Sequence, residues 1–170
     1  MGIEIPPQNA RDIPLPLTLL SGNFPKDICE TSLSLGDPVA VVDPGALRSV
    51  MQFLNTDARL RFNVLLDVTA VDYLGREPRF EVVYHLLSLS LNMRLRIKVK
   101  LPGTKPTLDS MTGLWESANW LEREVWDMFG IEFLGHPNLE RILLYPEFQG
   151  HPLRKDYPMR KRQPLVGPKN

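Results

Sequence analysis

Two carboxylates and two histidines in the second half of the chain belong to residue types that hold metals or transfer protons. Glu124 and Asp127 lie three residues apart in "NWLEREVWDMFG", and His136 and His151 each stand in a Gly-His-Pro triplet. Such groups could together bind a divalent metal or act as general acid and base. No His-x3-His spacing accompanies them, and neither histidine has a sequence neighbour of metal-ligand type. We therefore favour the alternative, in which the acids form structural ion pairs and the histidines form hydrogen bonds.

Other familiar chemistries lack their motifs in this sequence. Cys29 is the single cysteine, which excludes an internal disulfide, and an iron–sulfur or thiolate zinc site built by this chain alone. No Gly-x-Gly phosphate loop, Gly-x-Ser-x-Gly elbow or nucleic-acid recognition motif is present. No apolar run approaches the roughly 20 residues of a membrane span, and no secretory signal is visible. We expect a protein on the cytoplasmic side of the cell that binds no nucleic acid.

Charge is distributed unevenly along a chain whose formal net charge is zero. Residues 151–170 carry a net charge of +5, and the first 150 residues carry −5. This pattern predicts a basic C-terminal tail that binds an anionic partner surface.

The helix predicted around "NWLEREVWDMFG" must position Glu124 and Asp127. Asn119 with Glu122 three residues later is typical of a capping box, and Gly130 is a natural stop. The helix is apolar over most of its circumference, and a buried, unpaired carboxylate would cost several kcal/mol, roughly. Arg123 can neutralise Asp127 at i,i+4. Glu122 and Glu124 should therefore meet cations from outside the helix. The candidates are a second protein, or Arg141, Arg154 and Lys155.

The remaining elements indicate an α+β domain. "PVAVVDP" (38–44) predicts a buried strand, Asp43 and Pro44 predict the start of a helix, and residues 63–74 predict another strand. Residues 79–101 predict a hairpin turning at Leu91-Asn92. From Thr107 to Phe129 the pattern is helical, broken near Gly113 or residues 117–119. This order points to a two-layer domain with a largely antiparallel sheet and helices packed on it.

In the second arm of the hairpin, apolar residues alternate with a cationic row formed by Arg94, Arg96, Lys98 and Lys100. Two interpretations remain open: a solvated sheet face, which we favour, or a surface for an anionic partner.

Three regions follow from these patterns. Residues 1–35 predict an irregular lead-in, residues 36–134 the α+β domain, and residues 135–170 an extended, proline-rich docking tail. Six prolines lie within Pro137–Pro168, and each pushes its preceding residue toward extended conformations. The doubled Gly-His-Pro then marks turns in a strap whose cations find partners on another molecule.

The stretch "EREVWDMFGIEFLGHPNLERILLYPEFQGHPLRKDYP" (122–158) resembles the signature of the C subunit of bacterial NADH:quinone oxidoreductase, respiratory complex I, counterpart of the mitochondrial 30 kDa subunit. "YHLLSLSLNMRLRIKV" (84–99) is similar to the hairpin of that family. One departure is Glu140, where a basic residue is expected. Carried over to this sequence as signature or interface residues are Glu122, Arg123, Glu124, Asp127, Gly130, His136, Arg141, His151, Arg154, Lys155, Asp156 and Tyr157.

The resemblance implies a non-catalytic subunit of the peripheral arm, held at the cytoplasmic face of the membrane through its complex. FMN, iron–sulfur clusters and quinone would be bound by partner subunits and none by this chain. The tail would run over the D subunit, which shapes the quinone cavity, near the B subunit, which carries the last cluster. The complex would transfer electrons from NADH to quinone and translocate protons. The same module occurs in membrane-bound [NiFe]-hydrogenase-type complexes, which is the alternative assembly. A third hypothesis is an enzyme acting alone through Glu124, Asp127 and His136.

Overall fold

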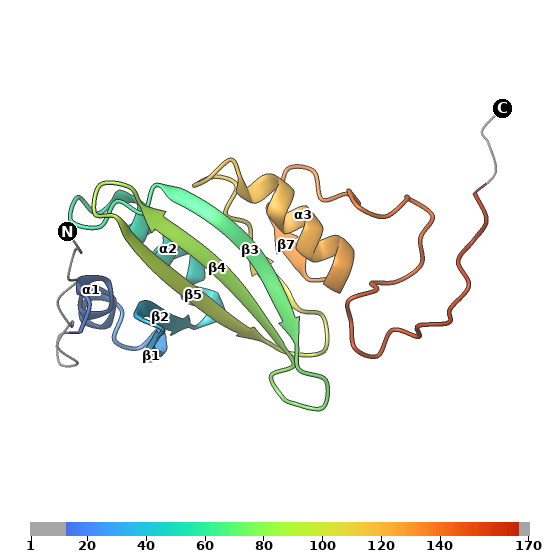
Figure 1. Ribbon diagram of the computed structural model, residues 1–170, viewed down its shortest axis with the longest axis horizontal. Coiled ribbons are helices and arrows are strands. Elements are labelled where there is room, and N and C mark those ends of the chain that lie inside the picture. Colours follow the sequence, from blue (N-terminus) through green and yellow to red (C-terminus); the bar gives the residue numbers. More distant parts are fainter. Residues whose placement is uncertain (1–12, 167–170) are drawn as a thin grey trace, which may run out of the picture.

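The computed structural model describes residues 13–166. Along the chain the elements are α1 (Leu15–Asn23), β1 (Ile28–Ser34), β2 (Asp37–Val42), the 3-10 helix η1 (Pro44–Ala46), α2 (Leu47–Thr56), β3 (Val64–Asp72), β4 (Phe80–Ser88), β5 (Met93–Leu101), β6 (Thr107–Asp109), α3 (Ala118–Phe129) and β7 (Glu132–Leu134). Residues 135–166, here called the C-terminal segment, contain no helix or strand and leave the domain beside α3 (Figure 1).

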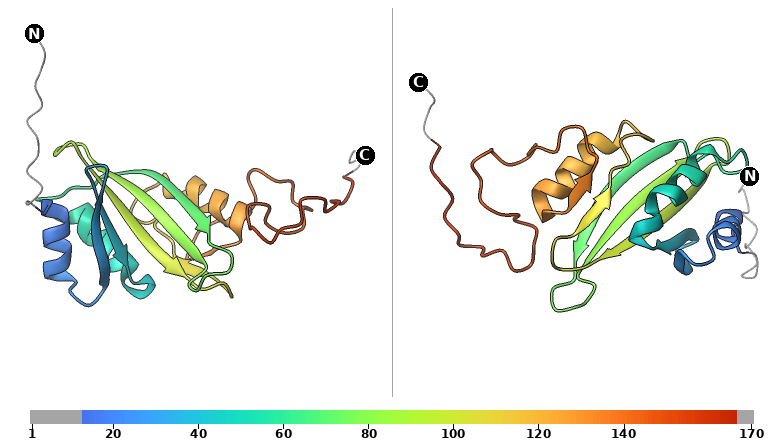
Figure 2. Two further views of the ribbon diagram at one scale, coloured as in Figure 1. Left: turned by 60° about the horizontal axis from the view of Figure 1, so that its bottom comes forward. Right: turned by 180° about the vertical axis from the view of Figure 1, so that it is seen from behind.

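A five-stranded sheet in the order β1-β2-β5-β4-β3 forms the centre of the domain. Its neighbouring strands are antiparallel except for β2 and β5, which are parallel. Strands β6 and β7 form a separate parallel pair. Seen from behind, α2 and α3 lie over one face of the sheet (Figure 2). The predicted α+β class with a largely antiparallel sheet is confirmed.

The core lies between the sheet and these helices because each element turns its apolar face to the same side. In β5 the residues Leu95, Ile97 and Val99 are buried, as the period of two predicts. In α2 the buried residues Leu47, Val50, Met51 and Leu54 follow helical spacing. The Asp43 side chain accepts a hydrogen bond from Gly45 N, which confirms its predicted capping role. Asn92 has φ of 47°, so the turn predicted at this residue is confirmed as well.

The cationic row lies on the sheet face opposite the core. Lys98 Nζ lies 2.8 Å from Glu81 Oε1 of β4, so one member of the row is paired within the sheet. The side chains of Val39 and Val41 in β2 are also buried on this face, beside Arg96 and Lys98. Aliphatic stems of long basic residues commonly cover apolar neighbours in this way. This arrangement is compatible with the solvated face that we favoured.

Two sequence-based expectations about secondary structure were wrong. Residues 15–34 contain helix α1 and strand β1 where we expected irregular chain. Leu17 and Leu20 of α1 reach the core, so tertiary packing outweighs the flanking prolines. The prediction for residues 1–12 lies outside the described residues. The expected helix from Thr107 instead begins at Ala118, after strand β6.

The capping box predicted at Asn119 and Glu122 is absent, because the helix is capped by Ser117 without a side-chain bond. Glu122 instead lies on the inner face of α3 and is fully buried. Its carboxylate accepts hydrogen bonds of 2.7 Å from both Ser110 Oγ and Met111 N. Burial raises the pKa of Glu122 to about 7, although both hydrogen bonds favour the charged form. Near neutral pH this group therefore binds and releases a proton inside the core.

We predict that Glu122 makes the protein less stable as pH rises from about 5 to 8. In the unfolded chain this carboxyl releases its proton near pH 4.5, whereas in the folded chain it keeps the proton up to about pH 7. The free energy of unfolding should therefore fall across this window, by at most about 3 kcal/mol, and level off above it. Glu122→Gln can still accept the bond from Met111 N through its amide oxygen, and its amide NH2 can donate to Ser110 Oγ in the reverse direction. This variant should therefore remove this part of the slope.

Urea unfolding of the whole chain at several pH values measures this slope. Glu124→Gln, on the exposed side of the same helix, is the matched control and should retain the wild-type slope. A Glu122→Gln variant whose stability falls with pH as steeply as that of the wild type would contradict the prediction.

Candidate functional site

Asp127, in the last turn of α3, fixes the C-terminal segment to the domain. Its side chain is fully buried. Its Oδ2 atom accepts hydrogen bonds from three successive backbone N–H groups, those of Ile142, Leu143 and Leu144, at 3.1, 3.0 and 3.0 Å. One carboxylate thus sets the backbone path of residues 142–144.

Arg141 completes this arrangement from the residue just before. Its guanidinium pairs with Asp127 Oδ1 and donates to the carbonyls of Phe148 and Gly150, at 2.9 and 3.1 Å. Burial by itself would raise the pKa of Asp127, but the backbone donors and Arg141 outweigh it, and this pKa lies below its ordinary value. Asp127 is therefore charged at neutral pH and holds a loop closed by Arg141.

The same segment satisfies the carbonyls at the carboxyl end of α3. The last turn of a helix leaves its carbonyl oxygens without intrahelical donors and carries partial negative charge. Here Asp127 O lies 3.0 Å from His151 Nδ1, and Met128 O accepts a 3.1 Å bond from Leu153 N. Arg154 donates from Nε to Phe129 O and from Nη2 to Gly130 O. The segment is thus the C-terminal cap of α3, with a cation at the favourable end of the helix.

Two glycines allow this close approach. Gly130 ends α3 with φ of 70°, which confirms the predicted stop. A Cβ atom at this position would lie 2.5 Å from the ring of His151 and 2.8 Å from Arg154. At Gly150, with φ of 100°, a Cβ atom would lie 2.9 Å from the Tyr157 ring. Glycine is therefore required at position 130 for two reasons: its positive φ, and the close approach of His151 and Arg154.

A second clamp holds the segment against the turn between β3 and β4. The guanidinium of Arg79 binds Asp72 at 2.7 Å and Asp156 at 2.8 Å. Asp72 also accepts a 2.8 Å bond from the backbone N of Lys155. The hydrogen bonds from Arg79 hold the pKa values of both carboxyls below their ordinary range. Asp72 and Arg79 were not among the residues predicted from the sequence, although their places at the end of β3 and just before β4 were a usable signal.

The histidines form hydrogen bonds, as we expected. Asn138 N donates to His136 Nδ1 at 3.0 Å, so the ring proton lies on Nε2 and is donated to Asn119 O at 3.1 Å. Burial lowers the pKa of His151, although its hydrogen bond to Asp127 O works in the opposite direction. Within residues 13–166, no three His, Cys, Asp or Glu side chains lie close enough to hold a metal ion.

The predicted cation partners of the helix were wrong. Glu122 meets Ser110 and Met111 and no cation, and Glu124 is exposed without a salt bridge to any described residue. Arg123 donates to the carbonyl of Glu140 instead of pairing with Asp127. Spacing within one helix could not reveal that Arg141 would approach Asp127 from the following loop.

The expectation that the arginines of the segment are free for another molecule was also wrong for two of them. Arg141 and Arg154 form hydrogen bonds with residues of α3, whereas the side chain of Lys155 is exposed. Tyr157 stacks on Phe148 with centroids 6.1 Å apart and receives a hydrogen bond from Gln163 Nε2. The segment is therefore bound to its own domain along one side.

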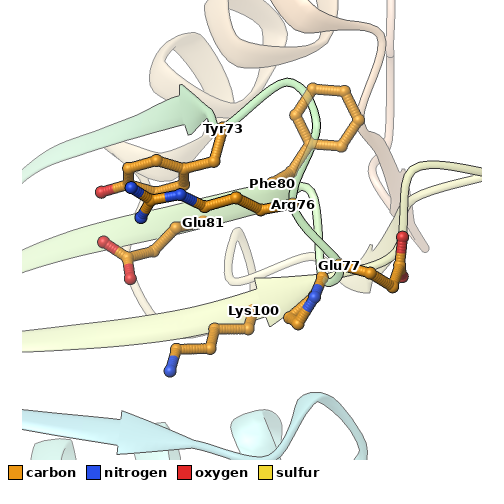
Figure 3. Close-up of a pocket in the computed structure, with 7 residues that line it drawn as sticks. Tyr73, Arg76, Glu77, Phe80, Glu81 and Lys100 are labelled. Atoms are coloured by element: carbon orange, nitrogen blue, oxygen red, sulfur yellow. The ribbon is translucent and has the colours of Figure 1, made fainter.

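A small pocket of about 280 Å³ lies at the same end of the sheet as the second clamp. Figure 3 shows Arg76 alongside Tyr73, with Glu81 and Lys100 extending from neighbouring strands. The Arg76 guanidinium lies 5.2 Å from the centre of the Tyr73 ring, and Glu81 is paired with Lys98. Because Arg76 packs on Tyr73 and Glu81 is already paired with Lys98, we assign the pocket no reaction.

We predict that Gly130→Ala releases the C-terminal segment from an otherwise folded domain. Gly135→Ala is the matched control, because it has a similar φ of 78° but nothing within 4 Å of the new Cβ. Both substitutions strain the backbone by about 1–2 kcal/mol. Only Gly130→Ala also clashes with the C-terminal segment. If this clash destabilises the closed position of the segment by about 1.4 kcal/mol, the open position becomes about tenfold more populated.

Limited trypsin digestion of both variants measures the rate of cleavage within residues 141–162. Far-UV circular dichroism checks that the domain remains folded. Equal cleavage rates in Gly130→Ala and Gly135→Ala would show that the contacts at Gly130 do not hold the segment.

Comparisons with known sequences agree with one another. The family described as "Respiratory-chain NADH dehydrogenase, 30 Kd subunit" matches residues 40–163. The C subunit of NADH-quinone oxidoreductase from Roseiflexus sp. (strain RS-1) is 49% identical over 84% of this chain and 82% of its own length. The protein of the same name from Citrifermentans bemidjiense is 46% identical over 87% of this chain and 92% of its own.

Solved structures share the fold. A trypsin-resistant fragment (1–134) of Nqo5 superimposes with a TM-score of 0.60 and 38% identity, covering 65% of this chain and 89% of the fragment. A chain of the membrane-bound sulfane sulfur reductase, an archaeal respiratory membrane complex, has a TM-score of 0.72 at 26% identity, covering 84% of each chain. With the sequence matches, these findings show that the chain belongs to the family of the respiratory-chain NADH dehydrogenase 30 kDa subunit, the C subunit of NADH-quinone oxidoreductase.

Proposed function

We propose that this chain is a non-catalytic brace in the peripheral arm of a proton-translocating NADH:quinone oxidoreductase. It binds the D subunit, which shapes the quinone site, and the B subunit, which carries the terminal iron–sulfur cluster. FMN, the iron–sulfur clusters and quinone are bound by partner subunits. The family match supports membership of this complex. The observation that carries the bracing role is the two-sided character of the C-terminal segment.

One side of the segment is bound to the domain, and the other exposes large apolar side chains. Exposed fractions are 60% for Leu143, 49% for Leu153, 99% for Met159 and 101% for Leu165. A chain on its own gains nothing by holding such side chains in water, and an interaction site on another protein would bury them. Each would contribute about 1.5–3 kcal/mol when fully buried against a partner.

The charge of the outer side specifies the partner further. Arg160, Lys161 and Arg162 are exposed between Met159 and Leu165. A partner surface with an apolar groove and an acidic rim would bind both kinds of side chain. The internal clamps at Asp127 and Arg79 reduce the entropy lost on docking, because they fix much of the path of the segment beforehand.

Attachment to the membrane would then come through the complex. Among the helices in residues 13–166, none has the length and apolar character needed to cross a bilayer. We propose that the chain lies on the cytoplasmic side of the membrane as a peripheral subunit. The oxidation of NADH and the translocation of protons would be activities of the whole complex.

The similarity to a chain of an archaeal sulfane sulfur reductase favours one alternative, the same module in a different respiratory membrane complex. A membrane-bound [NiFe]-hydrogenase-type complex belongs to this alternative. The companions of the chain distinguish the two. A flavin- and NADH-binding subunit in the isolated complex supports the first proposal, and a nickel–iron large subunit supports the second.

We predict that acidic substitutions on the outer side of the segment prevent assembly without unfolding the chain. The test variant is the triple substitution Leu153→Asp, Met159→Asp and Leu165→Asp. The matched control places three aspartates at exposed leucines in turns, Leu35, Leu74 and Leu89, which are 105%, 52% and 64% exposed. A single interface anchor is worth about 2 kcal/mol or more, so the test variant should assemble at least about tenfold less.

The measurement is affinity isolation of the complex from gently solubilised membranes, through a tag on another subunit. The amount of this chain in the isolated complex is then quantified, and thermal unfolding of each purified variant checks its fold. If the test variant assembles as well as the control, the outer side of the segment is not the docking surface.

A further inference from the structure

The exposed side of α3 presents a tryptophan between two exposed acids, a feature that the proposed function does not use. Trp120 is 63% exposed, although it lies on a well-packed helix. Glu116 lies four residues before it, in the turn that precedes the helix, and Glu124 lies one turn after it. Neither carboxylate forms a salt bridge with any residue of 13–166. This group of residues is called the Trp120 surface below.

The Arg123 side chain packs over one face of the Trp120 ring. The Arg123 guanidinium lies 5.0 Å from the ring centre, and its Nε donates to Glu140 O at 3.0 Å. Arg123 is thereby committed to one face of the ring and to the backbone of the loop. With 63% of the residue exposed, the other face of the ring remains accessible. An aromatic residue fixed in this way loses little entropy when it binds a partner.

A groove runs beside the ring. Its volume is about 640 Å³, and it lies between the start of α3 and the turn at residues 135–138. The wall formed by this turn is fixed, because His136 bonds to Asn119 O and Asn138 N bonds to His136. Glu116 and Trp120 both line the groove, together with Arg123 and Pro137. The groove is open enough for side chains of another protein.

The chemistry of the surface favours a cationic occupant. The open face of an indole ring attracts Lys or Arg, and each flanking carboxylate can receive a further cation. Glu124 lies about 6 Å along the helix from Trp120, close to the spacing of about 7 Å between alternate side chains of an extended peptide. The carboxylates would repel the phosphates of nucleic acid or of anionic lipid.

We propose that the Trp120 surface docks a basic, extended segment of a neighbouring protein subunit. One Lys or Arg of that segment stacks on the open face of Trp120, and others pair with Glu116 and Glu124. The inference deepens the proposed function, on which it rests, by adding an acidic contact on α3 to the basic contact of the C-terminal segment. Two surfaces of opposite charge would fix the orientation of the subunit as well as its attachment.

A photoreactive benzoylphenylalanine at position 120 tests the proposal in the assembled complex. The full chain carrying it is produced in cells, the complex is isolated and irradiated, and the cross-linked peptides are identified by mass spectrometry. We expect cross-links to a segment of another subunit that contains at least two Lys or Arg residues close together. An assembled complex without a cross-link, or with one only to a segment lacking Lys and Arg, would overturn the proposal.

Charge reversal provides a second measurement that does not depend on the probe. Glu116→Lys with Glu124→Lys should lower the fraction of chain retained in the complex after a salt wash by about tenfold. Glu30→Lys with Glu77→Lys changes the net charge equally at exposed acids elsewhere and should leave retention unchanged. Equal retention of the two variants would also overturn the proposal.

The two measurements separate this inference from the proposed function. If the chain co-purifies with an NADH-binding subunit but position 120 contacts no basic segment, only the inference fails. If the chain co-purifies with a different set of subunits and position 120 contacts a basic segment there, the docking surface stands and the proposed assembly fails.

Discussion

The carbonyl groups at the carboxyl end of α3 need hydrogen-bond donors, and residues that follow the helix in the chain supply them. Asp127 O, Met128 O, Phe129 O and Gly130 O all receive hydrogen bonds from the C-terminal segment. The buried carboxylate of Asp127 adds three backbone donors and one arginine. Removing one partner of such a buried pair costs about 3–5 kcal/mol. The path of residues 141–154 therefore follows from the hydrogen-bonding needs of one helix end.

This constraint divides the segment into two sides with different roles. The inner side contains charged groups that the sequence alone would assign to a partner, Arg141 and Arg154 among them. The outer side retains apolar residues that are individually ordinary, such as Leu143 and Leu153. Structural pairing thus occupies Arg141 and Arg154, whereas the side chains that stay exposed are those with the weaker sequence signal.

Patterns in the sequence predicted four of the five strands of the central sheet, all but β1, because the apolar pattern along a strand reflects its burial. The hairpin of β4 and β5, the strand at residues 38–42 and the helix stop at Gly130 follow from this kind of local rule. Helix α1 was not predicted, because Pro14 and Pro16 at its start indicate irregular chain. Its burial in the core through Leu17 and Leu20 becomes evident only in the folded structure. The family was also predicted from the residues, and so was the role of His136 and His151 as hydrogen-bonding groups.

Ion pairing could not be predicted, because it depends on which loop returns to which helix. Glu122 illustrates the difficulty, since a buried acid was expected to find a cation and instead binds a hydroxyl and a backbone N–H. Arg79 joins Asp72 and Asp156, residues that lie far apart in the sequence. No periodicity within a single element encodes such a three-way contact.

The parallel pairing of β2 with β5 imposes an order on how the chain can fold. Strands β3, β4 and β5 are consecutive and antiparallel, so they can form from contacts that are close in sequence. Strand β2 pairs with β5 across all of α2, β3 and β4, with Val39 opposite Arg96. Loop closure over such a distance is entropically costly before other contacts reward it, and non-local pairings of this kind slow folding. We therefore expect the meander of β3, β4 and β5 to form first, and the N-terminal third of the domain, although it leaves the ribosome first, to dock on it afterwards.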